Sequence, residues 1–126
     1  MTEHDTYLLI TERMAQLQLT LRGQRVLLDS HLAELYGVSS KTFNDKFRRN
    51  LRRFPEDFAF QLTDEETESL RSRFETLKKR RRPHVFTVHG ACMAAMLLDS
   101  SRALEIVRGL MNLPLLLKLS PDRLHS

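Results

Sequence analysis

The chain has 126 residues and a hydrophobic fraction of 41%, which predict one compact domain with a single core and argue against intrinsic disorder. Its 20 Lys and Arg outnumber its 16 Asp and Glu, for a formal net charge of +4, and its single cysteine, Cys92, excludes an intramolecular disulfide. The sequence has no signal peptide and no apolar run near the roughly 20 residues of a membrane helix, so we expect a cytoplasmic protein with no membrane partner.

The amino-terminal part of the chain predicts a β-hairpin. Residues 1–16 are expected to form an arm or a short helix. Leu17, Leu19 and Leu21 then alternate with polar residues, which is the period of a half-buried strand. Residues 25–28 are expected to return as the partner strand.

Two helices are predicted directly after the hairpin. The first begins at the N-cap residues 29–30 and ends at Gly37, which can adopt a left-handed C-cap conformation without strain. The second begins at Ser39 or Ser40 and is stopped by Pro55. Its apolar stripe consists of Phe43, Phe47 and Leu51, which recur every four residues, with Phe54 following.

Strands and helices alternate in the remaining sequence. The elements expected there are a strand over 58–62, a capped helix from Thr63 to about Phe74, a strand over 85–88, a helix over 90–98 and a last helix to about Met111. The whole order predicts an α+β fold with an amino-terminal β-hairpin, a helix-turn-helix, short further strands and carboxy-terminal helices.

Residues 29–48 match the pattern of a helix-turn-helix, in which a tight turn with a glycine joins two helices. Ala33 is small enough for the second helix to cross close to it, and Gly37 permits a positive φ. Val38 and Phe43 are expected to fill the space between the helices. This motif places the second helix on the surface, where it can contact a partner.

Two basic blocks flank an acidic one. Residues 37–53 carry a net charge of +5 and residues 71–82 one of +6, whereas residues 54–70 carry −6. At about 100° per residue, the basic side chains of the second helix lie opposite its apolar stripe, as a groove-binding helix requires. The blocks could also neutralise each other across the surface.

We expect DNA contacts from the helix residues Ser40, Lys41, Asn44, Arg48, Arg49 and Arg52, and from the loop residues Lys78, Lys79, Arg80, Arg81 and Arg82. Arg22 or Arg25 of the hairpin is expected to hold a further phosphate.

Residues 22–38 and residues 49–63 resemble the ORF-six N-terminal domain of the KilA-N superfamily, which is known from bacteriophages, large DNA viruses and bacterial chromosomes. The resemblance covers about residues 17–111. It implies a DNA-binding domain of the kind often found in phage antirepressor-like or regulatory proteins. We therefore assign residues 17–112 to this domain and residues 113–126 to an apolar tail. The function expected is that of a double-stranded DNA-binding transcription regulator of phage or prophage origin, associated with the bacterial nucleoid.

Two alternatives remain open about partners. The chain could be an antirepressor-like module that binds a repressor protein rather than DNA. The leucines of the tail, from Leu113 to Leu119, favour a homodimer surface and packing onto the chain's own core about equally.

No catalytic or metal site is predicted. His84, His89 and Cys92 have ligand-like spacings, but no fourth ligand accompanies them. The carboxylates around Glu66 crowd one predicted helix start, where the helix dipole favours them. There is no phosphate-binding glycine loop. We therefore expect a protein that is not an enzyme and takes no cofactor or metal.

Overall fold

The computed structural model describes residue 9, residues 12–78 and residues 82–108. Within them, four strands form one antiparallel sheet in the order β1-β2-β4-β3. The strands are β1 (Leu19–Leu21), β2 (Gln24–Leu28), β3 (Ala59–Gln61) and β4 (His84–Phe86). The α-helices with defined limits are α2 (Asp29–Tyr36), α3 (Ser40–Arg49), α4 (Asp64–Arg71) and α5 (Val88–Leu98). The short 3-10 helices are η1 (Leu51–Arg53) and η2 (Glu75–Leu77), and residues 12–17 and 101–108 are also helical. The predicted α+β fold is confirmed.

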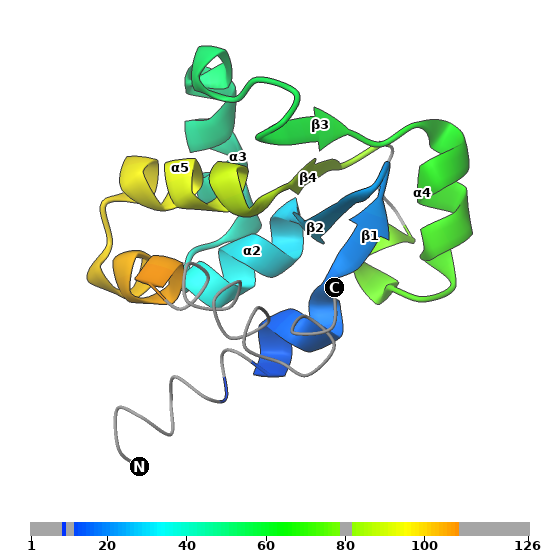
Figure 1. Cartoon of the computed structure of the whole chain (residues 1–126), viewed down its shortest axis with the longest axis horizontal. Helices are drawn as coiled ribbons and strands as arrows, with labels where there is room; N and C mark the ends of the chain where they lie inside the picture. Colours follow the sequence, from blue (N-terminus) through cyan, green and yellow to red (C-terminus); the bar gives the residue numbers. More distant parts are fainter. Residues whose placement is uncertain (1–8, 10–11, 79–81, 109–126) are drawn as a thin grey trace, which may run out of the picture.

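The first face of the sheet carries the larger core. The register pairs Phe86 with Leu27 on one side and with Ala59 on the other, so these three side chains point the same way. They belong to one buried cluster with apolar residues of α2, α3 and α5. Figure 1 shows these three helices gathered at one end of the sheet, away from α4.

The second face of the sheet carries a smaller core. Leu28, Val85 and Phe60 are aligned across β2, β4 and β3, and they pack with Leu77 of η2. Leu70 of α4 lies against the same cluster. The sheet therefore separates two apolar clusters, and α3 rests on the opposite face from α4 and η2.

The helix α5 begins very close to the loop before β3. Its N-cap is Thr87, whose hydroxyl oxygen accepts from the N–H of Gly90 at 3.3 Å and whose hydroxyl donates to the carbonyl of Asp57 at 2.8 Å. A Cβ added to Gly90 would overlap the carbonyl oxygen of Phe58. The position therefore accepts only glycine. The cap also starts the helix at Val88, before the predicted start at residue 90.

Two other predicted limits are wrong because tertiary packing sets them. Leu17 does not open the first strand, since residues 12–17 are helical and its side chain is buried in the larger core. The helix predicted to reach Phe74 ends at Arg71. The turn that follows brings the ring of Phe74 to 5.0 Å from that of His31.

The helical residues 101–108 complete the larger core, because Ala103 and Ile106 are buried in it. The predicted tail, residues 113–126, and with it the suggested homodimer surface, lie outside the described residues. In the part of the chain that the structure describes, no helix is both long enough and apolar enough to cross a membrane.

Candidate nucleic-acid interface

The candidate interface is built on α2 and α3, which are joined by residues 37–39. Gly37 has a φ of 74° and a ψ of 27°, the left-handed conformation that its place in the sequence predicts. Its N–H donates to the carbonyl of Glu34 at 3.1 Å, and the N–H of Val38 donates to the carbonyl of Ala33 at 3.0 Å. These two hydrogen bonds close the end of α2 and fix where α3 begins.

Two further side chains, which sequence reasoning missed, hold this turn in place. The Nε of Arg102 donates to the carbonyl of Leu35 at 3.1 Å, and the same side chain lies over Gly37. On the inner side, the hydroxyl of Tyr36 donates to the carbonyl of Ala91 at 2.6 Å. Burial raises the pKa of Tyr36, so the phenol keeps the proton that this bond needs. Neither residue carries a local sequence signal, since both partners lie far away in the chain.

The helix α3 is anchored at its start and along one side. Ser39 is its N-cap, and its hydroxyl oxygen accepts from the N–H of Thr42 at 3.0 Å. Phe43 and Phe47 are buried, with their rings edge-on to that of Phe86 at 5.1 Å and 5.0 Å. Because the phenylalanines fix the inner side, the opposite side of α3 faces solvent.

The α3 residues predicted to contact DNA lie on this outer side. Ser40, Lys41, Arg48 and Arg49 are exposed, and Asn44 is half-buried. The Nδ2 of Asn44 donates to the carbonyl of Ser40 at 2.9 Å. Its amide oxygen and the second hydrogen on Nδ2 remain for a base edge.

The prediction of a longer second helix is wrong. The chain leaves the helix at Asn50, which has a φ of −128° and a ψ of 29°, and continues into η1. Leu51 consequently leaves the apolar stripe and is 54% exposed. Phe54 is buried in its stead, and its ring lies 4.9 Å from that of Phe47. The core is thus completed by a residue one turn further along.

The turn η1 carries two exposed arginines. Arg52 was predicted as a DNA contact, and it lies in this turn rather than on the helix. Arg53 was missed, although the paired arginines before the buried Phe54 are a signal that could have found it. We call the exposed side chains of these two segments the α3–η1 surface; its members are Ser40, Lys41, Thr42, Lys46, Arg48, Arg49, Leu51, Arg52 and Arg53.

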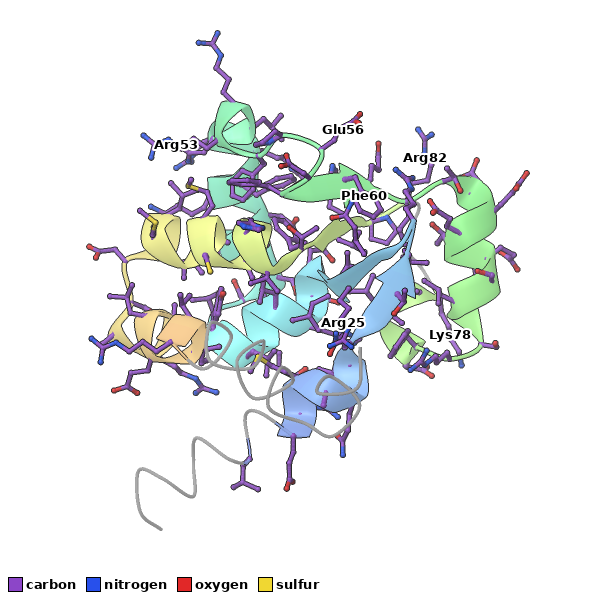
Figure 2. The ribbon with its side chains drawn as sticks, viewed as in Figure 1. Arg25, Arg53, Glu56, Phe60, Lys78 and Arg82 are labelled. Atoms are coloured by element: carbon purple, nitrogen blue, oxygen red, sulfur yellow. The ribbon has the colours of Figure 1, made fainter. Side chains whose placement is uncertain are left out.

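The two described residues of the basic loop, Lys78 and Arg82, lie elsewhere. Figure 2 shows Arg53 and Arg82 at separate ends of the same edge of the molecule, and Lys78 beside α4, on the same side of the view as Arg82. Lys78 pairs with Glu75 at 3.0 Å, and the Nε of Arg82 lies 3.9 Å from a carboxylate oxygen of Asp64. The structure therefore does not bring these two predicted site residues next to α3. The other three, Lys79, Arg80 and Arg81, lie outside the described residues.

The hairpin arginine Arg22 is engaged by a carboxylate. Its guanidinium donates to both carboxylate oxygens of Glu66, at 2.9 Å and 3.1 Å, and lies over the ring of Phe60 at 4.2 Å. Glu66 also accepts from the N–H of Thr63 in the capping box of α4. Arg22 therefore ties the hairpin turn to α4. Arg25 is exposed and lies apart from Arg53 in Figure 2.

This contact predicts an acid-dependent loss of stability. Arg22 lowers the pKa of Glu66 from 4.5 to about 2. A carboxyl with a lowered folded-state pKa stabilises the fold above its unfolded-state pKa, and the stabilisation is lost as the pH falls toward the folded-state value. The free energy of unfolding should thus fall between about pH 4.5 and pH 2, and less steeply in Glu66→Gln than in the wild type. Chemical denaturation at several pH values measures this. Glu65→Gln, an exposed neighbour, serves as the control, and equal slopes for wild type and Glu66→Gln would contradict the assignment.

The basic side chains of the described residues differ in whether they form an ion pair. Arg22, Arg71, Lys78 and Arg82 each pair with a carboxylate. By contrast, no ion pair among the described residues involves a basic side chain of the α3–η1 surface. The one acidic residue of α3 is Asp45, which is half-buried. The α3–η1 surface is therefore a positive patch that no carboxylate of the described residues neutralises in an ion pair.

His84 and His89 contact aromatic rings, and Cys92 is half-buried. The ring of His84 lies 4.8 Å from that of Phe47, and the ring of His89 stacks on Phe58 at 5.7 Å. Burial raises the pKa of the Cys92 thiol, which disfavours the thiolate that metals bind. Among the described residues, no three His, Cys, Asp or Glu side chains are grouped so that they could hold a metal ion.

The sequence profile of the ORF6N domain matches residues 16–97. The chain belongs to the ORF6N domain family. No curated protein and no solved structure matches it. The resemblance to the ORF-six N-terminal domain is thus confirmed, and with it the relation to phage antirepressor-like proteins of the KilA-N type.

The ORF6N match can be placed on the fold. It includes the whole sheet, both helices of the candidate interface and α4, and it ends one residue before the end of α5. The α3–η1 surface therefore lies entirely within the ORF6N domain. The helical residues 101–108, which carry Arg102, follow the match.

Proposed function

We propose that this ORF6N protein is a non-enzymatic regulator of phage or prophage origin that binds double-stranded DNA in the bacterial nucleoid. In this proposal α2 and α3 act as a helix-turn-helix, and α3 lies in the major groove. An α-helix with its side chains is about 10–12 Å across and fits a groove about 12 Å wide. The loop residues Lys79, Arg80 and Arg81 add contacts to the phosphate backbone.

One observation carries the proposal. The α3–η1 surface presents six basic side chains, Lys41, Lys46, Arg48, Arg49, Arg52 and Arg53, that have no ion-pair partner among the described residues. Phe43 and Phe47 hold the helix from behind, so the patch has a fixed shape. A rigid cationic helix with one inner apolar side has the charge and the geometry of a groove-binding element.

Binding to duplex DNA is therefore expected to depend steeply on salt. If the patch neutralises five or six phosphates, a plot of log K against log salt should have a slope of about −5, because each contact releases a condensed counterion. Titration of an arbitrary duplex at several salt concentrations measures this slope. If log K does not change with log salt, or if no duplex is bound at about 50 mM salt, the DNA proposal is wrong and a repressor protein is favoured as the partner.

A further inference from the structure

Leu51, the first residue of η1, exposes a large apolar side chain to solvent. Its side chain is 54% exposed, and it is the only large apolar side chain of the segment 48–53 that faces solvent. The core does not need it, because Phe54 fills the stripe and contacts Phe47 and Phe86 at ring distances of 4.9 Å and 5.7 Å. A single exposed leucine is ordinary on a protein surface. The position of Leu51 is less ordinary in two respects, its fixed backbone and its charged neighbours.

The backbone around Leu51 is fixed to the end of α3. The N–H of Asn50 donates to the carbonyl of Phe47 at 3.0 Å, and the side-chain Nδ2 of Asn50 donates to the carbonyl of Lys46 at 2.8 Å. The N–H of Phe54 then donates to the carbonyl of Leu51 at 3.0 Å. The leucine therefore projects from a hydrogen-bonded turn in a constant position relative to α3.

The neighbours of Leu51 in the chain identify the chemistry of its partner. Arg48, Arg49, Arg52 and Arg53 are exposed, and no ion pair among the described residues involves them. An apolar protein surface would have to strip water from these guanidinium groups without compensation. Duplex DNA offers both complements, since its phosphates pair with arginine, its major groove presents thymine methyl groups, and a base step can open to admit an apolar side chain between the base faces.

We propose that Leu51 is an apolar base-contacting residue, which touches the bases of duplex DNA while Arg49, Arg52 and Arg53 hold the phosphates on either side. This inference rests on the proposed DNA-binding function and adds to it an element of recognition that is independent of charge. In this inference η1 makes a base contact of its own, beyond the end of α3, the helix proposed to lie in the major groove.

The test compares Leu51→Ala with the wild type on a duplex selected from a random pool. Leu51→Ala should bind this duplex about tenfold more weakly, which is the usual range for the loss of one specific base contact, while the slope of log K against log salt stays the same. Replacing each thymine of the duplex by uracil distinguishes a thymine methyl contact from contact with the base faces. If Leu51 contacts a thymine methyl group, wild type and Leu51→Ala should bind the uracil duplex with equal affinity. If Leu51 contacts the base faces, wild type should still bind the uracil duplex more tightly than Leu51→Ala.

A matched control is Met96→Ala, which removes a 65% exposed apolar side chain from α5. It should bind like the wild type, and neither variant should change the melting temperature, because neither side chain is in the core. If Leu51→Ala binds the duplex as tightly as the wild type, the inference about Leu51 is wrong although the DNA proposal stands. If the wild type binds no duplex, the DNA proposal fails first. If Leu51→Ala instead abolishes self-association of the wild type in sedimentation, Leu51 belongs to a contact between copies of the chain and the inference is overturned.

Discussion

Replacing Gly90 by alanine is expected to lower the free energy of unfolding by about 3 kcal/mol or more. The added Cβ would overlap the carbonyl oxygen of Phe58, which belongs to the backbone and is held there by the N–H of Thr87 at 2.9 Å. The clash is thus relieved only if α5 moves away from the loop before β3. Urea denaturation of Gly90→Ala measures the loss.

The control for this prediction is Gly23→Ala. Gly23 has a φ of 75°, but nothing lies within 4 Å of an added Cβ, so this variant is strained only by its left-handed backbone. It should lose about 1–2 kcal/mol. Should Gly90→Ala prove no less stable than Gly23→Ala, the close approach of α5 to Phe58 would not be as the structure shows it.

The largest expected effect on DNA recognition concerns the outer side of α3. Replacing Asn44 and Arg48 together with alanine should remove about 1–3 kcal/mol of discrimination per lost base contact, and the loss should appear on a preferred duplex and not on a scrambled one. The physical reason is that a helix aims its side chains at fixed positions in the groove. Affinities for the two duplexes, measured at one salt concentration, give the discrimination directly.

The matched comparison is a double replacement in the basic loop, Arg80→Ala with Arg81→Ala. Phosphate contacts carry no sequence information, so this variant should weaken binding to both duplexes equally and reduce the salt slope by about one for each charge removed. If the loop variant loses the preference while the helix variant keeps it, the loop and not α3 reads the sequence.

Local chemistry made part of this structure predictable from the sequence. Gly37 ends α2 in the left-handed conformation, and Thr63 and Glu66 form the capping box of α4, as their spacing predicts. Such signals are contained within four or five residues. The alternation of Leu19 and Leu21 likewise predicted β1.

Features that depend on distant residues were not predictable in this way. The helix α3 ends early because Phe54, and not Leu51, reaches the ring of Phe86, and no local pattern distinguishes these two apolar residues. The pairing of Arg22 with Glu66 joins residues 44 positions apart. For the same reason the sequence could not predict which arginines already have a carboxylate partner.

The hydrogen bond from Arg102 to the carbonyl of Leu35 bears on where the protein can be shortened. The family match ends at residue 97, yet Ala103 and Ile106 fill the larger core and Arg102 covers the turn between α2 and α3. A fragment cut at the end of the match would keep every residue that defines the family. It would also uncover the turn at which α3 begins, so the smallest useful fragment of this protein extends at least through residue 106.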